Sequence, residues 1–105
     1  MPQADLFFTK DRHVPQSVLA EIEATIAAHD TAAGVCKGRL HPVDGHHSHV
    51  FLRLSLLPKP HRDDAYAAEL GKKLAEVIRP HVAAPSALAV NISFDLVHYT
   101  AVKVE

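Results

Sequence analysis

The sequence is poor in the residues that stabilise small secreted proteins or anchor a chain in a membrane. Its 105 residues include one cysteine, Cys36, so no disulfide can form within the chain, as is typical of proteins from a reducing compartment. No apolar run approaches the roughly 20 residues of a membrane-spanning helix. The N-terminus lacks the basic and then apolar segments of a secretory signal. We therefore expect a cytoplasmic protein with no membrane partner.

An excess of charge of one sign is also lacking. The chain has 11 basic and 12 acidic residues and a net charge of −1 with neutral histidines. A chain with this balance has no overall field that would attract nucleic acid or an anionic membrane, so any cationic site must be local. The length suits a single domain spanning residues 1–105. Because so small a domain buries a limited core, association with further copies would add stability.

The first half of the chain carries the pattern of a strand, a helix and a second strand. Loose alternation of apolar residues predicts a strand over residues 3–9. Apolar residues that recur every three or four positions predict a helix over residues 16–29. A short strand is expected over residues 39–43, where Pro42 indicates an edge or an end of the sheet.

The second half repeats this order without a residue-level repeat. The clearest alternation predicts a strand over residues 48–57. Asp63 or Asp64 can cap a second helix that Pro80 should end near Arg79, and a last strand is expected over residues 88–97. Two successive β-α-β units predict an α/β fold, an α+β two-layer sandwich with a four-stranded mixed sheet and both helices on one face.

The sheet face without helices is expected to mix apolar and polar side chains. Such a face is either solvated or packed against other subunits. Arg53 on this face could pair with Asp95 or with a neighbouring subunit, or it could touch a substrate. His98 and Tyr99 could reach a pocket or close the sheet edge. The residues expected on this face are Phe7, His49, Phe51, Arg53, Asn91, Ser93, Asp95 and Val97.

Several short segments follow one another in a distinctive order and spacing. They are the initial MetPro, AlaGlyVal (33–35), ArgLeuHis (39–41), AspGlyHisHis (44–47) followed by Phe51 and Leu56, Arg62, and SerPheAspLeu (93–96). In these segments the chain resembles the tautomerase superfamily, and within it the 5-carboxymethyl-2-hydroxymuconate isomerases. The resemblance implies a homotrimer with active sites near subunit boundaries, a small acidic substrate and no cofactor.

The resemblance also implies an isomerase that ketonises a dienol dicarboxylate of the 2-hydroxymuconate type in the breakdown of aromatic compounds. In this reaction the N-terminal proline takes a proton from the enol hydroxyl and returns it to a distant carbon. A free α-amino group has a pKa of about 7.7–8.0, and an apolar pocket or nearby cations lower it toward the value that a general base needs. The catalytic residue is then Pro2, provided that Met1 is removed.

Cationic side chains are needed to bind the substrate carboxylates and to stabilise the charge that develops on oxygen. The resemblance assigns one such arginine to Arg62. The other family arginine, just after the first helix, falls on Lys37 or on Cys36, depending on which segment anchors the comparison. Lys37 supplies a charge without the planar fork of arginine, and Arg39 is the alternative.

Each of these assignments has a simpler alternative. Pro2 could be an ordinary strand-start residue, and Arg62 and Lys37 could be solvated loop charges. The chain could then be a non-catalytic trimer of the same fold that binds a small acid or serves a structural role.

Four histidines close together in the sequence raise the question of a metal site. Zinc needs three or four converging ligands, and neither a partner cysteine pair nor an HExxH helix accompanies these histidines, so we expect no metal. Cys36 lacks a charged setting that would activate its thiol. The four are His41, His46, His47 and His49.

Overall fold

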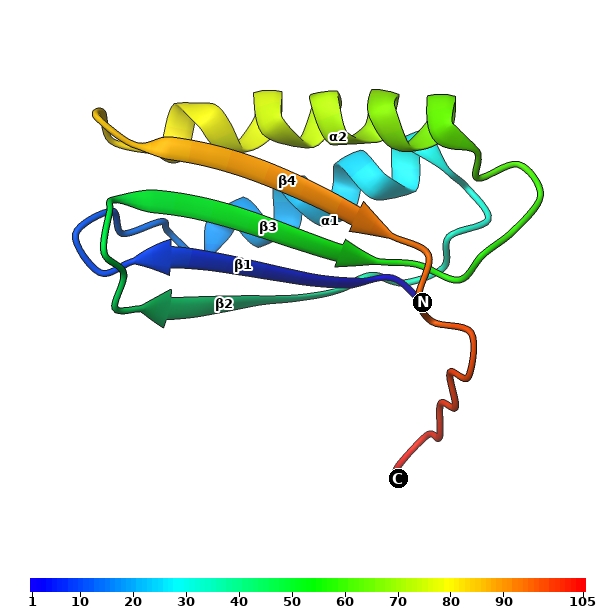
Figure 1. Ribbon diagram of the computed structural model, residues 1–105. Helices are drawn as coiled ribbons and strands as arrows, with labels where there is room; N and C mark the ends of the chain where they lie inside the picture. The colour runs from blue at the N-terminus through cyan, green and yellow to red at the C-terminus, as the bar shows by residue number, and fades with distance from the viewer.

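A computed structural model describes residues 1–105 and shows two β-α-β units in succession (Figure 1). The order of elements is the predicted one, with an additional 3₁₀ turn after the second helix. The elements are β1 (Gln3–Thr9), α1 (Ser17–His29), β2 (Lys37–Val43), β3 (His49–Ser55), α2 (Asp64–Ile78), the 3₁₀ turn Arg79–His81, and β4 (Ala87–Ser93).

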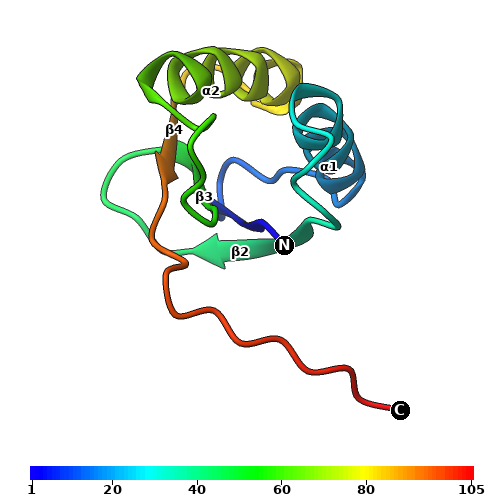
Figure 2. The same ribbon diagram turned by 90° about the vertical axis from the view of Figure 1, so that its right-hand side faces the viewer.

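The four strands form one mixed sheet in the order β2-β1-β3-β4. Strand β1 pairs in parallel with β2 and antiparallel with β3, and β3 pairs in parallel with β4. Both helices cover the same face of the sheet, α1 against β2 and α2 against β4 (Figures 1 and 2). Neither helix is long and apolar enough to cross a membrane. The predicted α+β two-layer sandwich is thus confirmed.

Three strand boundaries differ from the prediction by two residues or more. Strand β3 ends at Ser55 rather than at residue 57. Strand β4 ends at Ser93, and the predicted continuation to Val97 is wrong because its partner β3 ends opposite, at Ser55. Strand β2 begins at Lys37, two residues before the predicted start, because the Lys37 amide donates to the Pro2 carbonyl oxygen. The C-terminal segment after β4 extends away from the two layers toward the C-terminus (Figure 2).

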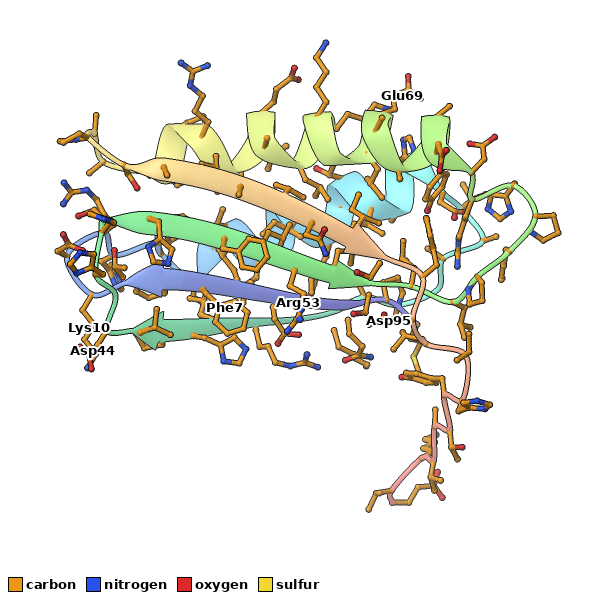
Figure 3. All side chains as sticks on the ribbon, viewed as in Figure 1. Phe7, Lys10, Asp44, Arg53, Glu69 and Asp95 are labelled. Atoms are coloured by element: carbon orange, nitrogen blue, oxygen red, sulfur yellow. The ribbon has the colours of Figure 1, made fainter.

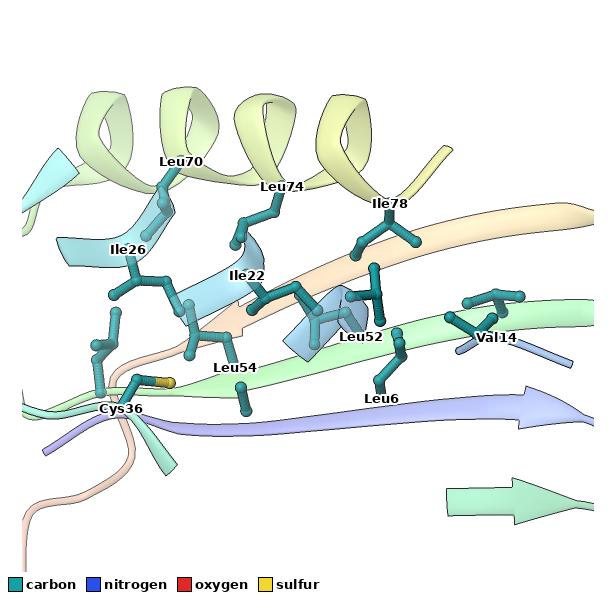
Figure 4. Packing of buried hydrophobic residues seen from close by; sticks show 14 of the residues in the cluster. Leu6, Val14, Ile22, Ile26, Cys36, Leu52, Leu54, Leu70, Leu74 and Ile78 are labelled. Carbon is teal, nitrogen blue, oxygen red and sulfur yellow. The ribbon is translucent and has the colours of Figure 1, made fainter. Parts of the chain in front are cut away.

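The core lies between the helices and the sheet. Alternate residues of β1 and β3 point toward the helices, where they meet residues spaced four apart on α1 and α2 (Figure 4). Because both strands are flanked by further strands, their inward side chains are almost fully buried. The central members of this cluster are Leu6, Leu52, Leu54, Ile22, Ile26, Leu70 and Leu74.

The opposite sheet face, here called the open face, carries the remaining side chains of the strands. Phe7 stacks on Phe51 across the β1–β3 pair with ring centroids 6.4 Å apart. Arg53 is exposed on this face (Figure 3) and forms no ion pair with Asp95 within the chain. With the pairing to Asp95 not formed, a neighbouring subunit and a substrate remain as partners for Arg53.

Truncating a core leucine should measure how much the sheet depends on this packing. Leu52 is fully buried, so Leu52→Ala should lower the free energy of unfolding by about 2–5 kcal/mol, through lost apolar contact and the cavity left behind. Urea unfolding followed by circular dichroism gives the value. Lys72→Ala, on the exposed side of α2, is the matched control and should stay within about 0.5 kcal/mol of the unaltered protein. Equal losses in the two variants would contradict the core described here.

Candidate active site

Pro2 lies at the start of the central strand pair. Pro2 is buried, and its carbonyl oxygen accepts a hydrogen bond from the Lys37 amide at 2.9 Å. Met1 precedes it and is 38% exposed. Because β1 and β2 run in parallel, the first residues of both strands lie at the same end of the sheet. The fold therefore brings the sequence-predicted residues Pro2 and Lys37 together.

The first residues of β1 and β2 also form a polar network on the open face. Gln3 lies opposite Lys37, and Asp5 lies opposite Arg39. One nitrogen of Arg39, Nη1, donates to both Asp5 carboxylate oxygens, at 2.9 and 3.1 Å. The other, Nη2, donates to Oε1 of Gln3. Arg39 thus points along the sheet toward Gln3, whereas Lys37 is exposed and forms no ion pair within the chain.

His41 belongs to this network as well. Its Nε2 lies 2.7 Å from Oδ1 of Asp5, and its ring stacks on Phe7 with centroids 4.6 Å apart. Partial burial raises the pKa of Asp5, but the hydrogen bonds from His41 and Arg39 outweigh this effect and lower it. Nowhere in the chain do three or more histidine, cysteine or acidic side chains gather in a way that could hold a metal ion.

The C-terminal segment reaches the same end of the sheet through Tyr99. The side-chain nitrogen of Gln3 donates to the Tyr99 hydroxyl at 3.1 Å, and it also lies 3.5 Å from the carbonyl oxygen of Met1. Of the two alternatives for Tyr99, the structure therefore favours a place beside the candidate site. Gln3 and Asp5 were not recognised in the sequence, because a polar residue in a half-buried strand has no distinctive local pattern.

Arg62 lies at this end of the molecule but is engaged with another residue. Its side chain is 2% exposed, and its Nε lies 3.0 Å from Oδ2 of Asp30, whose side chain is 4% exposed. Its Nη1 donates to the Leu57 carbonyl oxygen at 2.6 Å. The interpretation of Arg62 as a solvated loop charge is therefore wrong. Direct contact with a substrate would require the guanidinium to leave Asp30.

Asp30 is the centre of a buried cluster that sequence reasoning missed. Besides Arg62, its Oδ2 accepts a hydrogen bond from the Tyr66 hydroxyl at 2.8 Å and lies 3.1 Å from Nε2 of His61, while Ala32 donates its amide to Oδ1. These hydrogen bonds outweigh the effect of burial and hold the pKa of Asp30 well below its usual range. Burial, together with the hydrogen bond to Asp30, raises the pKa of Tyr66 to about 12. The cluster fastens the loop before α2 to the end of α1.

Cys36, the second candidate position for the family arginine, is a buried core residue. Burial and the nearby Glu23 carboxylate raise the pKa of its thiol to about 11. A thiol with so high a pKa stays neutral near pH 7. Cys36 therefore provides neither a charge for a carboxylate nor an activated nucleophile.

No hollow of the single chain encloses Pro2. An open groove of about 500 Å³ lies between the end of α2 and the start of β4, and a smaller hollow of about 220 Å³ lies at the turns around Lys10 and Gly45. Neither is lined by Pro2, Lys37, Arg39 or Arg62. The predicted site residues thus gather at one end of the sheet. Pro2 and Arg62 are buried, Lys37 and Arg39 are exposed, and no cavity of the single chain joins them.

Comparison with known proteins supports the architecture. No sequence family and no curated protein matches the chain. In structure it is similar to a 5-carboxymethyl-2-hydroxymuconate isomerase from Deinococcus radiodurans R1, with a TM-score of 0.64 and 21% sequence identity over 88% of this chain and 81% of that one. At this identity the similarity shows the fold. The chain therefore has a tautomerase-like fold, as the resemblance implied.

The buried pair of Arg62 and Asp30 predicts a large loss of stability when the cation is removed. Arg62→Met keeps much of the side-chain volume but leaves Asp30 as a buried charge with fewer partners. The free energy of unfolding should fall by about 3–5 kcal/mol in urea titrations at pH 7. The matched control Lys10→Met removes one partner of the exposed pair with Asp44 and should cost less than about 1 kcal/mol. A loss for Arg62→Met as small as that of the control would contradict a structural role for the pair.

The same cluster predicts a specific pH dependence of stability. The folded pKa of Asp30 lies below its unfolded value of about 3.9, so its contribution is complete above that pH and is lost as the pH falls through the folded pKa. The unaltered protein should therefore lose stability between about pH 5 and pH 2, and Asp30→Asn should lose less over this range. Urea unfolding at several pH values measures the slope. The control Asp44→Asn, at an exposed carboxylate, should keep the original slope; an unchanged slope in Asp30→Asn would rule out the assignment.

Proposed function

We propose that the protein is an isomerase of the tautomerase type, which ketonises a 2-hydroxymuconate-like dienol dicarboxylate with the amine of Pro2 as acid and base. The observation that carries this proposal is the position of Pro2: it is the second residue, buried, at the head of the central strand of a tautomerase-like fold. The similar structure from Deinococcus radiodurans belongs to a 5-carboxymethyl-2-hydroxymuconate isomerase.

The reaction requires Met1 to be absent, because only then is the Pro2 nitrogen a secondary amine with a lone pair. The neutral amine removes the proton from the enol hydroxyl, and the resulting dienolate spreads its charge over the conjugated chain. The protonated amine then delivers the proton to a distant carbon and forms the ketone. The proline ring fixes the direction of the nitrogen through both steps.

Lys37 is the cation that we propose to bind a substrate carboxylate. It lies next to Pro2 across the β1–β2 pair, is exposed and has no acidic partner within the chain. Arg39 lies two residues further along the same edge strand and is held by Asp5. Arg62 shapes the neighbouring loop through Asp30, and its contact with substrate would need this pair to open.

A homotrimer would complete the site, since the single chain has no cavity at Pro2 that could hold a substrate. The exposed apolar residues fit this proposal, because three of them lie in the C-terminal segment that extends from the body of the protein. Arg53 on the open face likewise has no partner of its own chain. The three exposed residues are Val97, Val102 and Val104.

Burial of Arg62 favours a second candidate function. In a protein without the proline chemistry, Arg62 would have a structural role only. Its ion pair with Asp30 would fix the loop between β3 and α2. Such a protein would be a non-catalytic trimer of the same fold that binds a small acid. It would bind the dienol dicarboxylate without converting it.

Turnover of 2-hydroxymuconate by protein that begins at Pro2 separates the two functions. The unaltered protein should ketonise the dienol, and Pro2→Ala should lower kcat by about 10²–10⁴-fold, the usual share of a general acid–base group. The change is followed by the loss of dienol absorbance. Lys72→Ala, remote from Pro2 on α2, should leave kcat unchanged. Equal turnover by Pro2→Ala would refute the proline mechanism, and binding without turnover would favour the second candidate.

A further inference from the structure

We propose that the side-chain amide of Gln3 is a further catalytic group, which donates a hydrogen bond to the enol oxygen of the substrate, and that Arg39 and Tyr99 position it. This inference rests on the proposed function of Pro2. It adds the group that stabilises the negative charge left on oxygen when the proline takes the proton. Three features of the N-terminal end of the sheet support it.

The first feature is the direction of the Gln3 side chain. Its nitrogen Nε2 lies 3.5 Å from the carbonyl oxygen of Met1. That carbonyl carbon is bonded to the Pro2 nitrogen, so its oxygen marks a position directly beside the future amine. Removal of Met1 takes away this oxygen and leaves the amide donor beside the vacated position. A substrate oxygen that gives its proton to Pro2 must lie at about the same place.

The second feature fixes which end of the amide faces the substrate. Arg39 has only donors, so its Nη2 must contact the carbonyl oxygen of Gln3, and the amide nitrogen then points toward the N-terminus. Asp5 holds Arg39 with two hydrogen bonds to Nη1, which restrains the guanidinium. The chain Asp5–Arg39–Gln3 therefore presents a donor, rather than an acceptor, beside Pro2.

The third feature is the occupation of the two amide hydrogens. One is donated to the Tyr99 hydroxyl, 3.1 Å away, which restrains the amide from a second side. The second hydrogen is then available for the Met1 oxygen, which lies 3.5 Å from Nε2, and in the processed chain for a substrate oxygen. Tyr99 and Arg39 thus act through Gln3 as positioning residues, and Gln3 alone touches the substrate oxygen.

The chemistry matches this arrangement. When the O–H bond of the enol breaks, its proton goes to the Pro2 nitrogen and its electron pair joins the conjugated dienolate. A hydrogen bond to the oxygen stabilises this charge more strongly than it stabilises the neutral enol, so it acts on the transition state. The proton then passes from Pro2 to carbon, and the oxygen ends as the ketone oxygen of the product.

Steady-state kinetics with 2-hydroxymuconate test the inference in protein that begins at Pro2. Gln3→Met keeps the shape of the side chain without the donor, and Gln3→Glu keeps the partner of Arg39 but replaces the donor with an acceptor. Both variants should lower kcat by about 10- to 100-fold and change KM by less than about threefold. This loss of kcat is somewhat smaller than the loss expected when a donor is removed from an enclosed oxyanion site. Arg39→Met and Tyr99→Phe should lower kcat in the same direction by a smaller factor.

Asn91→Ala is the matched control, because Asn91 lies on the same open face and its side chain bonds only to Ser93. It should leave kcat and KM unchanged. If Pro2→Ala abolishes turnover while Gln3→Glu and Gln3→Met retain the unaltered kcat, the Gln3 inference is wrong and the proposed function stands.

Calorimetric binding gives a second readout that does not depend on turnover. The ketone product carries the oxygen that Gln3 is proposed to contact, whereas cis,cis-muconate has a similar carbon chain without it. The unaltered protein should bind the ketone more tightly than muconate, and Gln3→Met should reduce the ratio of the two Kd values toward one. An unchanged ratio would overturn the inference, and failure of both acids to bind would reject the proposed function with it.

Discussion

The hydrogen bond from the Lys37 amide to the Pro2 carbonyl oxygen starts the parallel pairing of β1 with β2 and sets its register. Because this register begins at residue 2, the N-terminus is held at the head of a strand instead of fraying. The same register places Lys37 and Arg39 of the edge strand β2 opposite Gln3 and Asp5 of β1. Lys37 and Arg39 depend on this pairing for their positions near Pro2.

The buried Asp30 supports the loop beside the candidate site without being part of the site. Its contacts with Arg62, Tyr66 and His61 join the loop after β3 to the end of α1. A carboxylate so thoroughly hydrogen-bonded stays ionised and keeps the guanidinium oriented. Two arginines predicted to face the substrate thus serve other partners in the single chain, Arg62 with Asp30 and Arg39 with Asp5. Of the three cations assigned through the resemblance, Lys37 alone has no acidic partner within the chain.

Hydrophobic periodicity was enough to predict the elements and the two layers, because each helix and the sheet have one apolar face to bury. The mixed strand directions came with the resemblance to a known family. The start of β2 and the ends of β3 and β4 were not predictable, since they depend on where the partner strands begin and stop rather than on local pattern. Pro2 and Lys37 were found through the resemblance to a known family. Gln3, Asp5 and Asp30 were missed because their roles arise from contacts between residues far apart in the chain, such as Gln3 with Tyr99.

The central claim is that Pro2 acts as a free secondary amine, and the intact mass of the untagged protein purified from its native host tests it most directly. Met1 occupies the position beside the Pro2 nitrogen that the substrate oxygen must take, so the two cannot be present together. The account predicts the mass of residues 2–105. A mass that includes Met1 would make Pro2 an ordinary amide and would contradict both the proline mechanism and the role of Gln3.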